Sequence, residues 1–469
     1  MGGMNYTRGS GHMRARRDNA GTGAGPDEQS VGTLSVVDAV AVIAGVVVGA
    51  GIFRCPSIVA ANVGSLGGLV AAWLLGGAIS LVGALCYAEL ASAFPHPGGE
   101  YHLLTRAYSR GLGFLFAWAR LTVIQTGSIA GLAFVLGDYM ADVLHSSSPS
   151  YSAAYAAGCV ALLTGLNVAG VRQGACVQKL LTAAKVLGLA LVGAAALLAG
   201  GPAAAPHDSA GQAAAGSGHF GLAMVFVLFT FGGWNEAAYI AAELRDRRHG
   251  VVRALMVAVS GIAVLYVAVN LAYVHVLGLR GAADSGAIAA DMMRQVGGNW
   301  GVAVTGSLVA IAALGATNAT ILTGARAYYA LGRDHPALGL LGKWRASGAT
   351  PAAGLIAQGV VTLAVIAVGA MTRKGFQTMV DYTAPVFWFF FLLVGASVIV
   401  LRVREPLAER GFRVPLYPVA PVLFCGACGF MLHAAVVYAG RGALVGLGVL
   451  AAGVPVWFAC RALGRRHTT

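Results

Sequence analysis

Charged residues are scarce in this chain of 469 residues: only 10% are Asp, Glu, Lys or Arg, whereas 58% are hydrophobic. A soluble domain of this size carries far more charge, so the composition excludes a water-soluble protein. The stretch from Cys55 to Ala88 contains no charged residue at all, and it is too long for one membrane span of about 20 residues. The turn-forming residues 62–68 therefore join two spans, and we expect an all-α integral membrane protein with many transmembrane helices.

The sequence also lacks the residue patterns that most enzymes need. Outside the two interrupted spans described below, it shows no metal-ligand cluster, no nucleophile beside a base and no phosphate-binding loop. We therefore expect no catalytic residues, no metal and no cofactor. The 7 cysteines all fall in or at the ends of apolar segments, where they are typical of packing.

Twelve apolar segments can be read along the chain as membrane spans. They cover residues 34–58, 66–93, 112–144, 151–170, 176–200, 219–243, 251–279, 300–330, 352–371, 377–401, 418–440 and 442–462. Most of the 31 Lys and Arg residues fall on one side of these spans. Because basic loops stay in the cytoplasm, both termini are expected there, in a multi-pass protein of the plasma (inner) membrane. The net charge of +13 then reflects topology and contact with anionic lipid, so no nucleic-acid partner is expected.

The first predicted span is interrupted by residues 46–56. Gly49 and Gly51 favour non-helical dihedral angles, and Pro56 cannot donate a helical hydrogen bond. Such an interruption leaves backbone N–H and C=O groups unpaired, which hydrocarbon tolerates only where the backbone lines a cavity inside the protein. Many secondary transporters build a substrate site in this way. The alternative is a packing face of small residues, which is common in membrane helices.

A second glycine-interrupted span contains Gly232 and Gly233, and polar Asn235 and acidic Glu236 follow directly. The two interrupted spans are the first and the sixth, so each opens a set of five. Paired interruptions in corresponding positions indicate an inverted-repeat transporter. We therefore predict a disordered cytoplasmic tail over residues 1–32, a first repeat over 33–200, a second repeat over 219–402, and two further helices with the cytoplasmic C-terminus over 403–469.

Basic side chains are predicted inside the spans. Lys185 is the only charged residue in the middle of its span, and a lone ammonium there must meet carbonyls, hydroxyls or a carboxylate. It is either a functional group or a structural ammonium that pins two helices. Arg120 lies near the cytoplasmic end of its span, which favours snorkelling or an inner gate over direct contact with a substrate. Glu89 and Glu100 are expected to pair with cytoplasmic basic groups.

Two motifs follow the second span. Residues 87–90 read Tyr-x-Glu-Leu, and residues 95–101 read Pro-x-x-Gly-Gly-Glu-Tyr. With Gly-Ala-Gly-Ile-Phe at residues 49–53, these motifs resemble the signature of the amino acid–polyamine–organocation superfamily. Phe-x-Phe-Gly-Gly-Trp-Asn at 229–235 and Gly-Ala-Thr-Asn at 315–318 resemble its prokaryotic L-type amino acid transporter branch. The resemblance covers nearly the whole fold. It implies a leucine-transporter-type fold, with two inverted repeats of five helices and two C-terminal helices.

The resemblance also implies where a substrate would bind. The α-carboxylate of an amino acid would meet the N–H groups of Ala50 and Gly51, with Val47 and Gly49 nearby. Its α-ammonium would meet carbonyls of the sixth span around Phe229 and Gly232, and of the first span near Val47. Phe229 corresponds to the family's aromatic gate, whereas Phe231 is either part of the pocket or an ordinary core or lipid-facing aromatic residue. The complete set of predicted substrate-binding residues is Val47, Gly49, Ala50, Gly51, Ile52, Phe229, Phe231, Gly232, Gly233 and Asn235.

In sodium-independent members of the superfamily, the lysine that matches Lys185 takes the place of a sodium ion. The resemblance therefore implies that Lys185 is a coupling residue. Its ammonium is expected near carbonyls at Gly45–Val46 and near a hydroxyl such as Thr317 or Thr320. A buried lysine can also carry a proton, so proton-coupled uptake and pure exchange both stay open.

These features favour a sodium-independent secondary transporter that moves neutral L-amino acids by alternating access. Few acidic residues accompany the interruptions apart from Glu236 and Glu243, which disfavours a cationic amino acid or amine as the substrate. From another class of protein, the alternative is a membrane sensor that binds amino acids without transporting them. A membrane enzyme fits worst.

The loop between the third and fourth spans, from Asp138 to Ser150, contains no cysteine. Animal relatives are tethered to a glycoprotein subunit by a cysteine in this loop. We therefore expect no disulfide-linked accessory subunit, and the expected partners are a neutral amino acid and membrane lipid.

Overall fold

The computed structural model describes residues 34–143, 149–198, 220–246, 249–343, 350–372 and 375–466. These residues are almost entirely helical, and no β-strand occurs among them. The predicted all-α membrane fold is therefore confirmed. The tail predicted over residues 1–32 lies outside the described residues.

The described residues form the following helices. In chain order they are α1 (Val36–Val47), η1 (Ala50–Phe53), α2 (Cys55–Val63), α3 (Leu66–Ala93), α4 (Glu100–Ala107), α5 (Arg110–Ala119), the π-helical turn η2 (Arg120–Ile124), α6 (Gln125–Val143), α7 (Pro149–Ala169), α8 (Val171–Leu198), α9 (Phe220–Phe231), η3 (Trp234–Glu236), α10 (Ala237–Ile240), η4 (Ala241–Glu243), α11 (Gly250–Asp284), α12 (Ile288–Asp334), η5 (Pro336–Leu338), α13 (Ala352–Ala370), α14 (Gly375–Arg404), α15 (Val419–Ala439) and α16 (Arg441–Arg466).

Among the described residues, 11 helices are long and apolar enough to cross a membrane, one fewer than the twelve predicted spans. The difference is the first span, which the structure divides into α1, η1 and α2. With 12 residues, α1 is too short to cross alone, because a span needs about 20. Helix α12 begins at Ile288 and changes direction at Gly298, where φ is 57°, so the part after this kink corresponds to the span predicted from residue 300.

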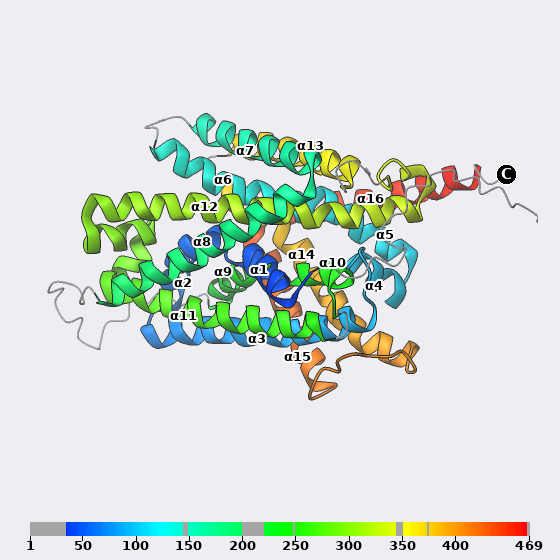
Figure 1. The fold of residues 1–469 in the computed structure, drawn as a ribbon, viewed down its shortest axis with the longest axis horizontal. Coiled ribbons are helices and arrows are strands. Elements are labelled where there is room, and N and C mark those ends of the chain that lie inside the picture. The colour runs from blue at the N-terminus through cyan, green and yellow to red at the C-terminus, as the bar shows by residue number, and fades with distance from the viewer. Residues whose placement is uncertain are drawn as a thin grey trace, which may run out of the picture.

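The interrupted helices lie in the middle of the bundle (Figure 1). Helix α12 crosses the molecule on one side of them, while α3 and α11 pack together on the other side. Helices α7 and α13 form a layer beyond α6. Because α1 packs against α8, α11 and α12, protein rather than lipid surrounds its broken end. Irregular backbone at membrane depth is tolerated only in such a position.

One carboxylate ties three parts of the chain together at one end of the bundle. Glu89 of α3 is buried and pairs with Arg402 of α14 (2.6 Å) and with Arg410 (3.3 Å). It also accepts a hydrogen bond from the backbone N–H of Val414 (2.7 Å). The expected pairing of Glu89 with basic groups is therefore present, and it fixes the α14–α15 connection against α3.

At Gly83 of α3, a side chain would collide with two aromatic rings. A Cβ atom there would lie 2.4 Å from the Phe424 ring and 2.6 Å from the Trp234 ring. We expect Gly83→Ala to lower the melting temperature of the detergent-purified protein, because overpacking a buried contact costs about 1–3 kcal/mol. The matched control is Gly261→Ala in α11, where a Cβ atom meets open space within 4 Å. Equal melting temperatures for the two variants would contradict this close packing.

Candidate functional site

The first interruption separates α1 from η1. Helix α1 ends at Val47, Val48 leaves the helical region (φ −76°, ψ 78°), and Gly49 is extended (φ −105°, ψ −159°). The chain restarts in the 3-10 turn η1 at Ala50. The first N–H groups of a helical turn have no partner within it, so Ala50 and Gly51 present their N–H groups at the break.

The second interruption follows α9. The chain turns through Gly232 and Gly233 before η3, and Gly233 has a positive φ of 111°. A Cβ atom at Gly233 would lie 2.6 Å from Val46 of α1, so this position requires glycine for both the turn and the close contact. A Cβ atom at Gly51 would likewise lie 3.3 Å from Oγ1 of Thr230 in α9. The two interruptions therefore touch each other.

Two tyrosines of α11 satisfy backbone carbonyls at the first interruption. The Tyr266 hydroxyl donates to the carbonyl of Val47 (2.9 Å) and also lies 3.3 Å from the carbonyl of Thr230. The Tyr273 hydroxyl donates to the carbonyl of Ile52 (3.3 Å). Sequence reasoning missed both residues, because nothing in the local sequence distinguishes them from other tyrosines in a span.

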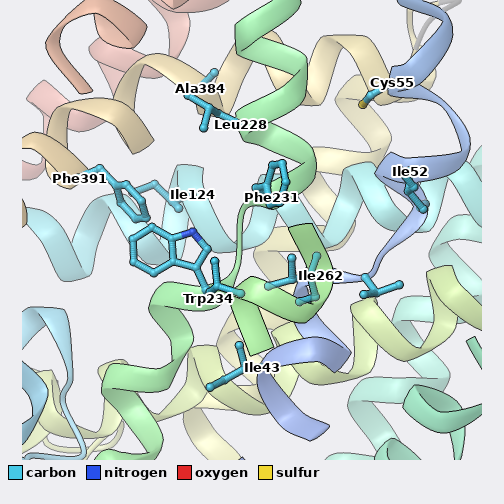
Figure 2. Packing of buried hydrophobic residues seen from close by; sticks show 14 of the residues in the cluster. Ile43, Ile52, Cys55, Ile124, Leu228, Phe231, Trp234, Ile262, Ala384 and Phe391 are labelled. Carbon is cyan, nitrogen blue, oxygen red and sulfur yellow. The ribbon is translucent and has the colours of Figure 1, made fainter. Parts of the chain in front are cut away.

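A cavity lies between the two interruptions. The predicted residues that line it are Val47, Gly49, Gly51, Phe229, Gly232, Gly233 and Asn235. The remaining three, Ala50, Ile52 and Phe231, are buried and do not line it. Phe231 packs in the hydrophobic core (Figure 2). Its ring centroid lies 6.0 Å from that of Trp73 and 5.1 Å from that of Tyr266. Of the alternatives left open for Phe231, the geometry favours core packing.

The walls of the cavity beyond the interruptions are largely apolar. They include Ile124, Leu132, Val225, Phe387, Trp388 and Phe391. At one end, the ring of Phe229 lies 5.9 Å from the ring of Phe376 in an edge-to-face arrangement. Phe376 lines a separate hollow together with Arg54 and Asp138. The pair Phe229–Phe376 therefore stands between the cavity and this hollow.

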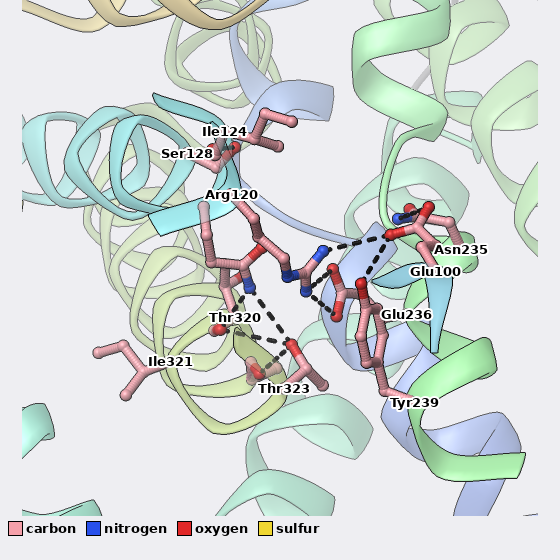
Figure 3. Close-up of polar contacts among 12 residues, drawn as sticks. Glu100, Arg120, Ile124, Ser128, Asn235, Glu236, Tyr239, Thr320, Ile321 and Thr323 are labelled. Atoms are coloured by element: carbon pink, nitrogen blue, oxygen red, sulfur yellow. Dashed lines mark hydrogen bonds and ion pairs between the residues drawn. The ribbon is translucent and has the colours of Figure 1, made fainter. Parts of the chain in front are cut away.

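At another part of the cavity lie three charged side chains that we call the inner cluster: Glu100, Arg120 and Glu236 (Figure 3). Arg120 is 1% exposed, and one of its Nη atoms lies 2.8 Å from both carboxylate oxygens of Glu236. Its other Nη atom lies 3.3 Å from Glu100. Arg120 opens the π-helical turn η2, a local distortion that is frequent at functional sites.

The inner cluster corrects two expectations. Arg120 does not snorkel, because its guanidinium is buried among protein groups rather than extended toward water. Glu100 pairs with this intramembrane arginine and not with a basic group outside the spans. Glu236 was not among the predicted site residues. The available signal was an acidic residue placed directly after an interruption within an apolar span.

Lys185 lies fully buried against the end of α1. Its ammonium donates a hydrogen bond to the carbonyl of Gly45 (2.5 Å), so the predicted contact with this part of α1 is present. The prediction that a hydroxyl of Thr317 or Thr320 contacts the Lys185 ammonium is wrong. Thr320 donates instead to the carbonyl of Ala316 (2.8 Å), and Thr317 Oγ1 is buried without a hydrogen-bond partner among the described residues. Lys185 does not line the cavity.

Comparison of the sequence with known proteins identifies similar transporters and a matching protein family. The sequence profile of the amino acid permease family matches residues 34–460. The b(0,+)-type amino acid transporter 1 of Mus musculus is 29% identical over 404 residues, which cover 84% of this chain and 81% of that protein. The large neutral amino acids transporter small subunit 2 of Mus musculus is 30% identical over 437 residues, which cover 91% of this chain and 80% of that protein. Its Homo sapiens counterpart is 29% identical over the same length.

The inner cluster pairs two carboxylates with one guanidinium, so removing the guanidinium should destabilise the protein more than removing one carboxylate. Arg120→Gln would leave two buried carboxylates without their cation, which costs about 3–5 kcal/mol, whereas Glu236→Gln would leave one carboxylate with the arginine. We expect Arg120→Gln to lower the melting temperature more than Glu236→Gln does. The double variant should recover part of the loss of Arg120→Gln, since it removes one of the stranded charges. A double variant that melts no higher than Arg120→Gln would contradict the direct pairing.

Proposed function

Because the chain belongs to the amino acid permease family, we propose that it moves neutral L-amino acids across the plasma (inner) membrane by alternating access, without sodium. Membership confirms the resemblance drawn from the motifs, and with it a transporter rather than an enzyme. The observation that carries the finer proposal is the cavity between the two interrupted helices.

The two interruptions beside this cavity match the two charges of an amino acid. The N–H groups of Ala50 and Gly51 begin the turn η1, where a helical start favours an anion such as the α-carboxylate. The last carbonyls of α9, near Gly232, favour a cation such as the α-ammonium. The carbonyls of Val47 and Phe229 already accept hydrogen bonds from Tyr266 and from the N–H of Gly232. Gly232 is therefore the stronger candidate for the ammonium.

The rest of the cavity supports a neutral side chain. Its walls are aliphatic and aromatic around Ile124, Leu132 and Phe387. Glu100 and Glu236 also line it, which would favour the alternative of a cationic amino acid or amine. However, both carboxylates already contact the Arg120 guanidinium, so a substrate cation would have to compete with it. Two of the relatives are named as large neutral amino acids transporter subunits, and these names agree with the proposal of a neutral substrate.

Lys185 supports independence from sodium. Its ammonium contacts the Gly45 carbonyl just before the interruption in α1, and a Cβ atom at Gly315 of α12 would lie 3.4 Å from it. A fixed cation between α1 and α12 repels a second cation there: two unit charges about 4 Å apart repel by about 4 kcal/mol at an effective dielectric constant of 20. We propose Lys185 as the coupling residue in place of sodium, without a hydroxyl from Thr317.

Other features belong to the same proposal. The repeats over residues 33–200 and 219–402, and the cytoplasmic position of both termini, stay predictions. So does independence from a disulfide-linked subunit, which rests on the absence of cysteine between Asp138 and Ser150.

The experiment that tests the proposal uses the purified single chain in sealed liposomes. We expect labelled L-leucine to enter vesicles that contain unlabelled L-leucine, equally well in sodium and in choline buffer. A panel with L-alanine, L-lysine and L-glutamate defines the substrate class. Binding of L-leucine without entry into the vesicles would favour the membrane sensor. Strict dependence of uptake on sodium would contradict the role of Lys185 in place of sodium. Uptake only in the presence of a co-purified subunit would refute the proposal that the single chain is sufficient.

Lys185→Ala completes this experiment. It should strongly reduce uptake, because the cation between α1 and α12 is lost, with a smaller effect on insertion. The matched control is Lys179→Ala in the same helix, since Lys179 is 54% exposed and pairs with Asp38 at the start of α1. Full uptake by Lys185→Ala would contradict its role.

Gly51 provides a second, independent prediction. A Cβ atom there would lie 3.3–3.4 Å from Thr230, so Gly51→Val should crowd the meeting point of the interruptions and abolish binding of L-leucine. Gly67→Val is the control, because a Cβ atom at Gly67 meets open space. Wild-type affinity in a monodisperse Gly51→Val protein would exclude the η1 backbone from the site.

A further inference from the structure

The inner cluster holds more negative than positive charge. Glu100 and Glu236 contribute two carboxylates, and Arg120 contributes one guanidinium. All three side chains are at most 7% exposed. Uncompensated charge is costly in such a place, and a buried carboxyl group commonly takes up a proton instead. One further positive charge would therefore neutralise the inner cluster.

The geometry distinguishes the two carboxylates. Glu236 receives the close contact from Arg120, with both oxygens 2.8 Å from one Nη atom. Glu100 receives one longer contact of 3.3 Å from the other Nη atom. Its remaining partners are neutral: Tyr87 Oη (2.6 Å), Tyr239 Oη (2.9 Å) and Asn235 Nδ2 (3.3 Å). Glu100 is therefore the carboxylate with less compensation.

The neighbours of Glu100 come from several elements, and among the described residues the charged groups that act on it are Arg120 and Glu236. Tyr87 belongs to α3, Tyr239 to α10, and Tyr328 of α12 packs against Tyr239 with its own hydroxyl unpaired. Burial raises the pKa of the Glu100 carboxyl and Glu236 adds to this, while Arg120 and the two bonded tyrosines act in the opposite direction. A tyrosine hydroxyl can donate to a carboxylate or accept from a carboxylic acid, so both protonation states of Glu100 can be satisfied in place.

We propose that Glu100 is a proton-binding site that couples amino acid uptake to one proton. The proposal rests on the proposed function, since Glu100 lines the same cavity as the interrupted helices. A proton enters with the substrate and converts the Glu100 carboxylate to the acid. This removes its attraction to Arg120 and loosens α4 from η2. When the cavity opens to the cytoplasm, the acid releases the proton there and the contact with Arg120 reforms.

Lys185 is not part of this site. It contacts the Gly45 carbonyl and does not line the cavity, so a proton on Lys185 would not share the path of the substrate through the cavity. In this proposal the Lys185 ammonium holds the end of α1, and the carboxyl group of Glu100 binds the coupled proton.

The test measures two modes of L-leucine movement in liposomes. Exchange uses vesicles loaded with unlabelled L-leucine at equal pH on both sides. Net uptake uses empty vesicles with an acidic outside, and a trapped pH dye records proton entry. We expect the wild type to accumulate L-leucine with proton entry. We expect Glu100→Gln to lose accumulation and proton entry when each is measured relative to the exchange rate of the same variant. The control Glu405→Gln removes an exposed carboxylate that pairs with Arg106 outside the cavity, and should behave like the wild type.

The outcomes separate this proposal from the proposed function. Exchange without any response of the wild type to the pH gradient, or an undiminished response in Glu100→Gln, would overturn the proton site and leave the transporter standing. If neither mode moves any amino acid of the panel, the proposed function fails and the proton site fails with it.

A second variant keeps the proposal testable if Glu100→Gln does not fold. Tyr87→Phe removes the hydroxyl 2.6 Å from Glu100. Because this hydroxyl stabilises the ionised form, its loss should move the midpoint of pH-dependent uptake upward by roughly one pH unit. A midpoint that is unchanged or moves downward would overturn the assignment to Glu100.

Discussion

The structure depends on one constraint: backbone groups freed inside a membrane must find partners within the protein. At the end of α1 the carbonyl of Gly45 meets the Lys185 ammonium, and the carbonyls of Val47 and Ile52 meet the hydroxyls of Tyr266 and Tyr273. Each contact comes from a different turn of α8 or α11, so these helices must pack where they do. Of the two residues that start η1, Gly51 lines the cavity, and we propose that a substrate carboxylate meets the N–H groups there.

The sequence predicts the parts of this arrangement that are local. Glycines at 49, 51, 232 and 233 mark both interruptions, because few other residues tolerate the required dihedral angles or the close contact with a neighbouring helix. The contact of Lys185 with the end of α1 was also predictable, since a lone ammonium in an apolar span has few acceptors besides freed carbonyls. The division of the first span into α1 and α2 follows from the same glycines and Pro56.

Contacts between distant residues were not predictable in the same way. Glu236 lies 116 positions from Arg120 in the chain, and no periodicity connects them. Only the tertiary fold brings their charges together. The side of α9 on which Phe231 lies is similarly ambiguous, because a helix that is apolar all round gives no preferred face. Thr317 fails as a partner of Lys185 for a related reason, since a register error of one residue on α12 turns a side chain by about 100°.

The two interrupted helices are held by different chemistry, and this difference governs what can release each of them. The end of α1 is fixed through backbone carbonyls and a lysine that no carboxylate contacts among the described residues. Such contacts hardly change when the cavity gains or loses charge. The segment after α9 is fixed by Glu236 on Arg120, an ion pair shared with Glu100. Its strength changes with every charge that enters the cavity, because the three side chains are buried and solvent screens them weakly. A change of charge in the cavity therefore acts first on η3, η2 and α4, while α1 keeps its partners.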